Sequence, residues 1–321
     1  MKLMLPLLSF LSTLSLTAAE LRIGIIGCDT SHVVAFTETL NNAQARDHVP
    51  GGKVVAAYKG GSEDIPESVS RVNGYVKTLT EKYGVIMYDT IEDLCKNVDA
   101  VLLESLDGRP KLAQIKPVLV AKKPVFVDKP MAGSLRDVIE MFAMAKKRDV
   151  PMFTSSSLRF ASNTVAVHRG LIGTVTNAET FGPCELESHH PDLFWYGIHG
   201  VEALYAVMGT GCAMVQRTNT PDGKILVTGM WDRSRNGIFC EGKFHGIARG
   251  TEGEAPVGSF DGYVPLVRQI MTFFETKVAP VDPKQTIEIF AFMEAADLSK
   301  SRGGKPVKID EVMARATRPG K

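Results

Sequence analysis

The chain has 321 residues, with 37 Lys and Arg against 36 Asp and Glu, a formal net charge of +1 and 44% hydrophobic residues. The balanced charge, with no basic stripe, argues against nucleic acid as a partner, and the length is sufficient for two domains with separate cores. The five cysteines, at positions 28, 95, 184, 212 and 240, include no CxxC pair. Their spacing argues against a disulfide framework and against a cysteine zinc site.

The N-terminal residues 1–19 have the composition of a targeting segment. A single lysine precedes an apolar run, and small residues lead up to Glu20. This pattern predicts a secretory signal peptide that is cleaved after Ala19. The run is too short, and too interrupted by Ser and Thr, to be a good membrane span, and no twin arginine precedes it. We therefore expect an exported protein of the Sec type, periplasmic or secreted, with no membrane segment after cleavage.

The next stretch predicts the start of a nucleotide-binding fold. Ile23–Ile26 is a β-branched strand, Gly27 ends it in a turn, and a helical pattern starts at Ser31. A buried strand, a tight glycine turn and a helix N-terminus open the dinucleotide-binding βαβ unit, whose fingerprint is G-x-G-x-x-G.

Two positions of that fingerprint are altered. Asp29 and His32 stand where the second and third glycines belong. The second glycine lets the backbone approach a pyrophosphate, whereas Asp29 adds a side chain and a negative charge. At an effective dielectric near 20, two like charges about 4 Å apart repel by about 4 kcal/mol. Asp29-Thr-Ser31 also fits a helix N-cap, a role that does not exclude the first.

Strands and helices alternate as far as residue 150, which predicts a parallel sheet with ligands beyond the carboxyl ends of its strands. Lys59 follows the second strand, where an NAD-binding unit usually carries Asp or Glu. Lys59 suits either the 2′-phosphate of NADP or ordinary contact with solvent. The residues expected to bind NAD or NADP are Gly27, Asp29, Thr30, Ser31, His32, Lys59, Ser105 and Asp128.

A family resemblance rests on three segments. Gly24–Gly27, the strand and loop around Ser105, and Val127-Asp-Lys-Pro-Met-Ala132 resemble the Gfo/Idh/MocA oxidoreductases. That family is named for glucose–fructose oxidoreductase and inositol dehydrogenase and is marked by a Glu-Lys-Pro motif. The resemblance implies an α/β fold with a doubly wound parallel Rossmann sheet over residues 20–150. It also implies a C-terminal α+β domain over residues 151–321, with an open, mostly antiparallel sheet through which homo-oligomers form.

The resemblance also implies roles for individual residues. Lys129 would be the active-site lysine, with Pro130 in the cis form, and Asp128 replaces the glutamate of the motif. His199, at the start of a predicted helix, matches the catalytic histidine of the family. Trp195 stands one helical turn earlier, where the family commonly has Asp.

Further polar and aromatic residues are expected near the cleft. Arg159 matches a position that is frequently polar in the family, and the segment from residue 188 to 208 is rich in chemically active side chains. The expected substrate-binding residues are Arg159, His189, His190, Trp195 and Tyr196. The histidines and carboxylates of the two domains match no standard metal-binding spacing, so no metal site is predicted.

Three function classes remain open from the sequence. The first is NAD(P)-linked oxidation of a sugar, polyol or glycoside, with Lys129 and His199 handling the hydroxyl proton. The second is a redox-neutral carbohydrate lyase, epimerase or hydrolase, and the third is a cofactor-free carbohydrate-binding protein. Asp29, Lys59, Trp195 and export all weaken the first, because free nicotinamide cofactor is not expected outside the cytoplasm. Retention of Lys129 and His199 weakens the case for a cofactor-free binding protein, and the breadth of the family favours NAD(P)-linked oxidation.

Overall fold

A computed structural model describes residues 19–231 and 235–318 of the chain. Most of the predicted signal peptide, residues 1–18, lies outside them. The N-terminal sheet has the strand order β3-β2-β1-β4-β5-β6, and all of its pairings are parallel. This is the Rossmann order, which reverses between β1 and β4 and opens a crevice there. The strands are β1 (Leu21–Ile26), β2 (Gly52–Tyr58), β3 (Ile86–Tyr88), β4 (Ala100–Leu103), β5 (Val125–Val127) and β6 (Met152–Thr154).

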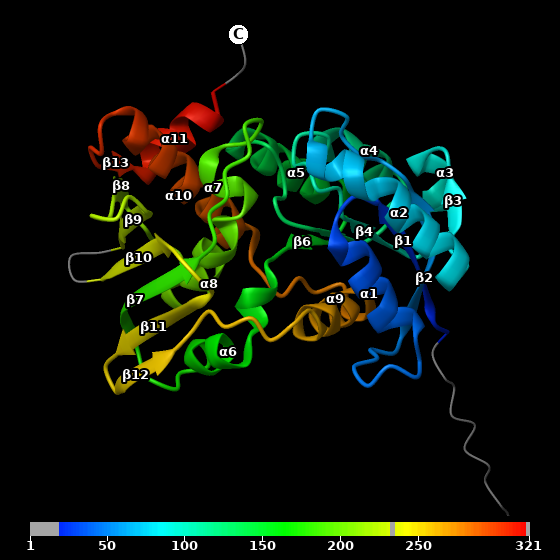
Figure 1. Cartoon of the computed structure of the whole chain (residues 1–321), viewed down its shortest axis with the longest axis horizontal. Helices are drawn as coiled ribbons and strands as arrows, with labels where there is room; N and C mark the ends of the chain where they lie inside the picture. The colour runs from blue at the N-terminus through cyan, green and yellow to red at the C-terminus, as the bar shows by residue number, and fades with distance from the viewer. Residues whose placement is uncertain (1–18, 232–234, 319–321) are drawn as a thin grey trace, which may run out of the picture.

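Helices cover both faces of this sheet (Figure 1). The sequentially local ones are α1 (Ser31–Asn41), α2 (Pro66–Tyr83), α3 (Ile91–Lys96), α4 (Lys111–Val120) and α5 (Leu135–Arg148). A late helix, α9 (Val264–Thr276), returns to lie beside α1, and its Phe273 and Phe274 are buried in the core of this sheet. The N-terminal unit therefore runs past residue 150, through β6, and also includes a segment from the C-terminal half.

The second sheet has the order β12-β11-β7-β10-β9-β8-β13. Its pairings are antiparallel except for β7 with β10, so an open, mostly antiparallel sheet is confirmed. Its strands are β7 (Val175–Gly182), β8 (Met214–Asn219), β9 (Ile225–Met230), β10 (Asn236–Glu241), β11 (His245–Gly250), β12 (Gly253–Pro256) and β13 (Val307–Lys308). The helices of this half are η1 (Ser157–Phe160), α6 (Ser162–His168), α7 (Asp192–Trp195), α8 (Ile198–Met208), α10 (Pro283–Ser301) and α11 (Ile309–Ala316).

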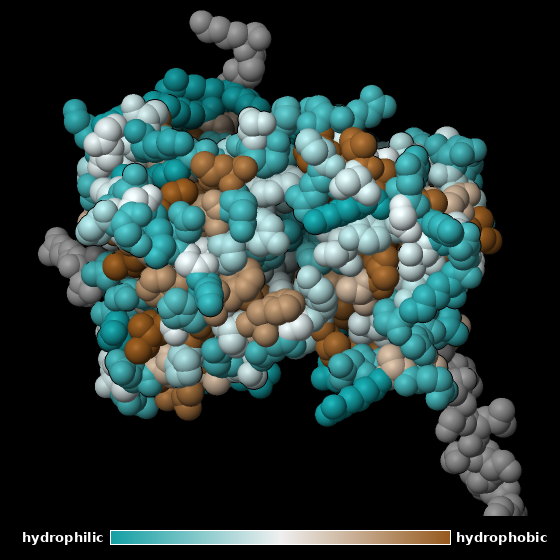
Figure 2. Space-filling model, in the orientation of Figure 1, coloured by the Kyte–Doolittle hydropathy of each residue, from teal (hydrophilic) through white to brown (hydrophobic). Residues whose placement is uncertain are grey.

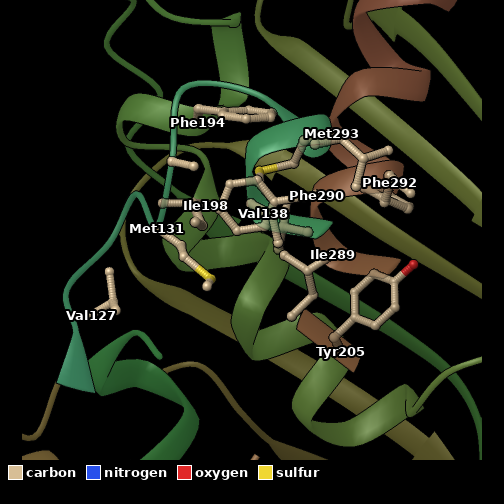
Figure 3. Close-up of a cluster of buried hydrophobic side chains, with 14 of the residues drawn as sticks. Val127, Met131, Val138, Phe194, Ile198, Tyr205, Ile289, Phe290, Phe292 and Met293 are labelled. Atoms are coloured by element: carbon tan, nitrogen blue, oxygen red, sulfur yellow. The ribbon is translucent and has the colours of Figure 1, made fainter. Parts of the chain in front are cut away.

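One continuous core joins the two halves (Figure 3). Val127 and Met131, which flank the Asp-Lys-Pro motif, are buried with Phe194 and Ile198 from α7 and α8. Phe290 of α10 packs edge-on against Phe194, with ring centroids 4.8 Å apart. Because protein cores are close-packed, this cluster fixes the segment that carries Lys129 relative to the start of α8.

The surface is mostly hydrophilic on the face shown in Figure 2, with apolar side chains in small groups and a hollow where the two halves meet. Across the described residues, no helix combines the length and the hydropathy needed to cross a bilayer. The five cysteines are buried and form no disulfide.

Candidate active site

A cavity of about 250 Å³ lies between the two halves of the molecule. The N-terminal half contributes the start of α1, two residues of α2 and the motif lysine, and the C-terminal half contributes the segment around α7 and α8. Residues lining the cavity include Thr30, Ser31, His32, Glu67, Arg71, Lys129, Pro130, Trp195, Tyr196, His199, Phe244, Phe260 and Tyr263. Lys129 and His199, which the sequence predicts to be catalytic, therefore share one cavity although they are far apart in sequence.

Lys129 follows the carboxyl end of β5, and its bond to Pro130 is cis, as the resemblance implies. Buried Lys111 of α4 holds this backbone, because its Nζ donates to the carbonyls of Asp128 at 2.6 Å and Pro130 at 2.9 Å. Burial lowers the pKa of Lys111 to about 8. Burial also lowers the pKa of Lys129, although the Asp128 carboxylate acts against it. The Nζ of Lys129 lies 5.5 Å from the ring centroid of Tyr196.

His199 enters the cavity from the first turn of α8. Its Nδ1 lies 2.7 Å from Oγ of Ser156. Burial, together with the charges of Lys129 and His32, lowers the pKa of His199 well below its usual value. A neutral imidazole beside a lysine ammonium can accept a proton while the cation stabilises a developing negative charge.

His32 and Asp128 form a buried pair on the side of the N-terminal half. Nδ1 of His32 lies 2.7 Å from Oδ2 of Asp128, and their side chains are 9% and 2% exposed. The His32 ring stacks on Phe36 at 5.3 Å and meets the ring of Tyr263 edge-on at 4.7 Å. The sequence predicts both residues to bind a cofactor, whereas in the structure their side chains bind each other.

Glu104 is a further functional candidate, and no local sequence pattern marks it. It follows β4 and is fully buried, and both of its carboxyl oxygens lack a hydrogen-bond partner in the described part of the chain. Burial, reinforced by the negative charge of Asp128, raises the pKa of Glu104 well above its usual value. Burial alone would also raise the pKa of Asp128, but His32 and Lys129 outweigh it and hold that pKa well below the usual range. Burial therefore favours the neutral form of Glu104, whereas His32 and Lys129 favour the charged form of Asp128.

Asp29 points into the protein, away from the start of α1. Its side chain is fully buried and accepts from the Leu106 amide at 2.9 Å and from Oγ of Ser68 at 2.7 Å. The N-cap of α1 is Thr30, whose hydroxyl accepts from the His32 amide. The N-cap expected within Asp29-Thr-Ser31 is therefore confirmed at Thr30 but not at Asp29, whose donors come from the β4–α4 loop and α2.

The predicted cofactor residues fit a dinucleotide at one end only. Thr30, Ser31 and His32 lie beside the cavity, where a nicotinamide-sized group has room. Among the predicted set, Ser31 and Lys59 are exposed, whereas the protein itself buries Gly27, Asp29, Thr30, His32, Ser105 and Asp128. Gly27 has φ of +87°, and an added Cβ would lie 2.5 Å from the Ser105 amide nitrogen. This turn therefore requires glycine, as the first position of the fingerprint does. A diphosphate beside this turn would meet the buried charge of Asp29.

His189 and His190 lie outside the cavity, contrary to the prediction that they bind substrate. Nδ1 of His190 lies 2.6 Å from a Glu187 oxygen, and its Nε2 accepts from the Gly108 amide at 3.1 Å. His189 also contacts Glu187, at 2.7 Å. These contacts hold the loop before α7 against the β4–α4 loop. Across residues 19–231 and 235–318, no cluster of three or more His, Cys, Asp and Glu side chains is placed to hold a metal ion.

Arg159 was also predicted to bind substrate, but it lies outside the cavity. Residues 151–160 predict a single strand that returns from the last Rossmann helix, but β6 ends at Thr154 and Arg159 lies on the helical turn η1. Its guanidinium forms a buried ion pair with Glu202 of α8 and does not line the cavity. Of the predicted substrate-binding residues, Trp195 and Tyr196 line it. Phe244, Phe260 and Tyr263 complete the aromatic wall, and no local sequence pattern marks them.

A Rossmann sheet joined to an open mixed sheet, with a lysine and a histidine sharing the cavity between them, is the architecture of a dinucleotide-linked oxidoreductase. Residues 21–156 match the model of the oxidoreductase family with an NAD-binding Rossmann fold. Over 108 residues the chain is 37% identical to myo-inositol 2-dehydrogenase of Thermotoga maritima, a match that covers 30% of this chain and 31% of that protein. Residues 21–156 are therefore similar to the Gfo/Idh/MocA oxidoreductases, and this similarity supports membership of that family.

Solved structures show the same fold over almost the whole chain. Scyllo-inositol dehydrogenase from Lactobacillus casei, solved with NAD(H) and scyllo-inositol, aligns with a TM-score of 0.72 at 12% identity, covering 91% of this chain and 100% of that one. An oxidoreductase from Agrobacterium radiobacter, solved with NAD+, L-tartaric acid and magnesium, aligns with a TM-score of 0.68 at 15% identity, covering 92% and 100%. At these identities the similarity concerns the fold.

Proposed function

We propose that the protein oxidises a secondary hydroxyl of a small polyol or sugar in an NAD(P)-linked reaction. The observation that carries the proposal is the meeting of Lys129 and His199 in one cavity between the domains. Lys129 would hold the hydroxyl oxygen and stabilise its developing negative charge. Neutral His199 would accept the hydroxyl proton. A nicotinamide cofactor held beside Thr30, Ser31 and His32 would supply the hydride acceptor for the carbinol carbon, so that the alcohol would become a ketone.

The cavity supports a ring-sized, polar substrate. Its volume, about 250 Å³, lies just below the usual range of small-molecule sites. Trp195, Tyr196 and Tyr263 offer apolar faces for the C–H surface of a sugar ring, while Glu67 and Arg71 offer partners for its hydroxyls. The inositols named for the relatives have this size and chemistry.

The test is a spectrophotometric assay of NADH and NADPH formation with myo-inositol, scyllo-inositol and a panel of monosaccharides. Lys129→Ala and His199→Ala should each lower kcat by about 10²- to 10⁴-fold in a folded protein, as expected for loss of a proton-transfer partner. Lys116→Ala and His168→Ala, two exposed positions outside the cavity, are the matched controls. Turnover of an identified substrate that is unchanged in both active-site variants would refute the assignment.

A second candidate function is redox-neutral acid–base chemistry on a carbohydrate, such as epimerisation or elimination. Buried Asp29 favours it, because its charge opposes a diphosphate at the glycine turn. The same panel, incubated without added cofactor and followed by NMR of the sugar protons, distinguishes this candidate. Product formed without any nicotinamide would establish it.

We also propose that the protein acts after export and as a homo-oligomer. The composition of residues 1–19 supports export. Phe181, Leu226, Ile238 and Ile247 support association, because they lie partly exposed on the sheet face opposite the one packed against α8 and α10. Fractionation of expressing cells tests the first, and light scattering coupled to gel filtration tests the second.

A further inference from the structure

His32, which lines the cavity, and Asp128, which is buried behind it, are two positions at which this chain departs from the family pattern, and their side chains touch. Oδ2 of Asp128 lies 2.7 Å from Nδ1 of His32, within hydrogen-bond distance. The other ring nitrogen, Nε2, makes no hydrogen bond with any of the described residues, and His32 lines the cavity that also contains Lys129 and His199. Both members of the pair are buried.

This geometry fixes the chemical state of the imidazole. A carboxylate that faces Nδ1 selects the tautomer with its proton on Nδ1 and leaves the lone pair on Nε2. The Asp128 carboxylate, 2.7 Å from Nδ1, would offset the positive charge that His32 gains when Nε2 takes up a proton. Stacking on Phe36 and the edge contact with Tyr263 restrict rotation of the ring.

We infer that His32 is a second proton-transfer residue of this site, held in its tautomer by Asp128 and acting from the opposite domain to His199. In the reaction, Nε2 of His32 takes a proton from a hydroxyl or from a carbon next to the new carbonyl. His32 thereby becomes an imidazolium paired with Asp128, and it later returns the proton to the product or to water. The catalytic part of this inference rests on the proposed function, whereas the tautomer and the reactivity of Nε2 do not.

The first experiment uses no substrate. Long-range ¹H–¹⁵N NMR of the ¹⁵N-labelled full-length protein reports the tautomer of each histidine, and His32→Gln identifies the signals of His32. We expect His32 with its proton on Nδ1, and preferential modification of its Nε2 by diethyl pyrocarbonate. His190 is the control, because its side chain is fully buried and both of its nitrogens are bonded. A proton on Nε2 of His32, or labelling no faster than that of His190, would overturn the inference.

The second experiment measures turnover with the inositol or sugar identified by the assay above. His32→Gln should lower kcat by about 10²-fold or more with little change in KM, and Asp128→Asn should lower kcat and disturb the His32 tautomer. His168→Gln should leave both unchanged. Full kcat in folded His32→Gln would refute the catalytic role. If wild-type protein turns over no probe, the proposed function fails, and the NMR and labelling results still decide whether Nε2 is an open base.

Discussion

Replacing Asp29 by asparagine should tighten dinucleotide binding and destabilise the fold. The amide side chain keeps the shape and an acceptor for the Leu106 amide but removes the buried charge. A unit charge repels a phosphate by about 2 kcal/mol at 8 Å and about 4 kcal/mol at 4 Å when the effective dielectric is 20. The affinity for NAD+ or NADP+ should therefore rise by about 30-fold to 10³-fold. Hydrogen bonds to a charged acceptor stabilise more than neutral ones, so unfolding should become about 1–2 kcal/mol easier.

Calorimetric titration of the purified protein with each dinucleotide measures the first effect, and urea denaturation measures the second. Ser68→Ala is the matched control, because it removes a donor to Asp29 at 2.7 Å and leaves the charge in place. It should lower stability without tightening dinucleotide binding. Micromolar or tighter binding by the unmodified protein would show that the diphosphate is accommodated beside Asp29. That result, or unchanged affinity in Asp29→Asn, would refute the electrostatic reasoning.

Two further predictions concern the buried charges near the motif. Lys111→Met should lower the free energy of unfolding by about 2–5 kcal/mol, because it leaves the buried carbonyls of Asp128 and Pro130 without their donor. Urea denaturation measures this loss, with exposed Lys116→Met as the control. An equal loss of stability in the two variants would contradict the role of Lys111. The pKa of His199 is lowered from the usual 6.5 by burial first. As the pH falls, His199 is therefore protonated in the unfolded chain before it is protonated in the folded protein. Stability should then fall as the pH drops below about 6.5, by at most about 1.4 kcal/mol per pH unit from this group. His199→Gln should flatten that slope and His168→Gln should not.

The sequence predicted the order of the elements well, because each carries its signal locally. The β-branched strand before Gly27 and the start of α1 at Ser31 follow from spacing and turn chemistry. Lys129 and His199 could be placed in one cleft because family resemblance supplies the long-range topology. Spacing alone gives no distance between two residues so far apart in the chain.

The directions in which buried side chains point could not be predicted from the sequence. Asp29 reads as an N-cap from its neighbours, but its partners, Ser68 of α2 and the Leu106 amide of the β4–α4 loop, come from segments much later in the chain. Arg159 reads as a strand residue near the cleft, but the short helical turn η1 directs it to Glu202. In both cases a tertiary partner outweighs the local pattern, because a buried charge needs a bonded counterpart.

The same reasoning gives a single physical cause for two separate departures from the family. A histidine in place of the third glycine would crowd the turn, and an aspartate in place of the motif glutamate is one methylene shorter. Asp128 and His32 meet at 2.7 Å, and at that distance each gives the other a partner for its buried polar group. The pair occupies the start of α1, where the backbone of an intact glycine fingerprint approaches the dinucleotide. In this chain His32 lines the cavity at that place with its imidazole ring. The altered fingerprint is thus better explained as a change of chemistry at the cavity than as decay of the fold, because a decaying site has no reason to keep a buried, hydrogen-bonded histidine–aspartate pair.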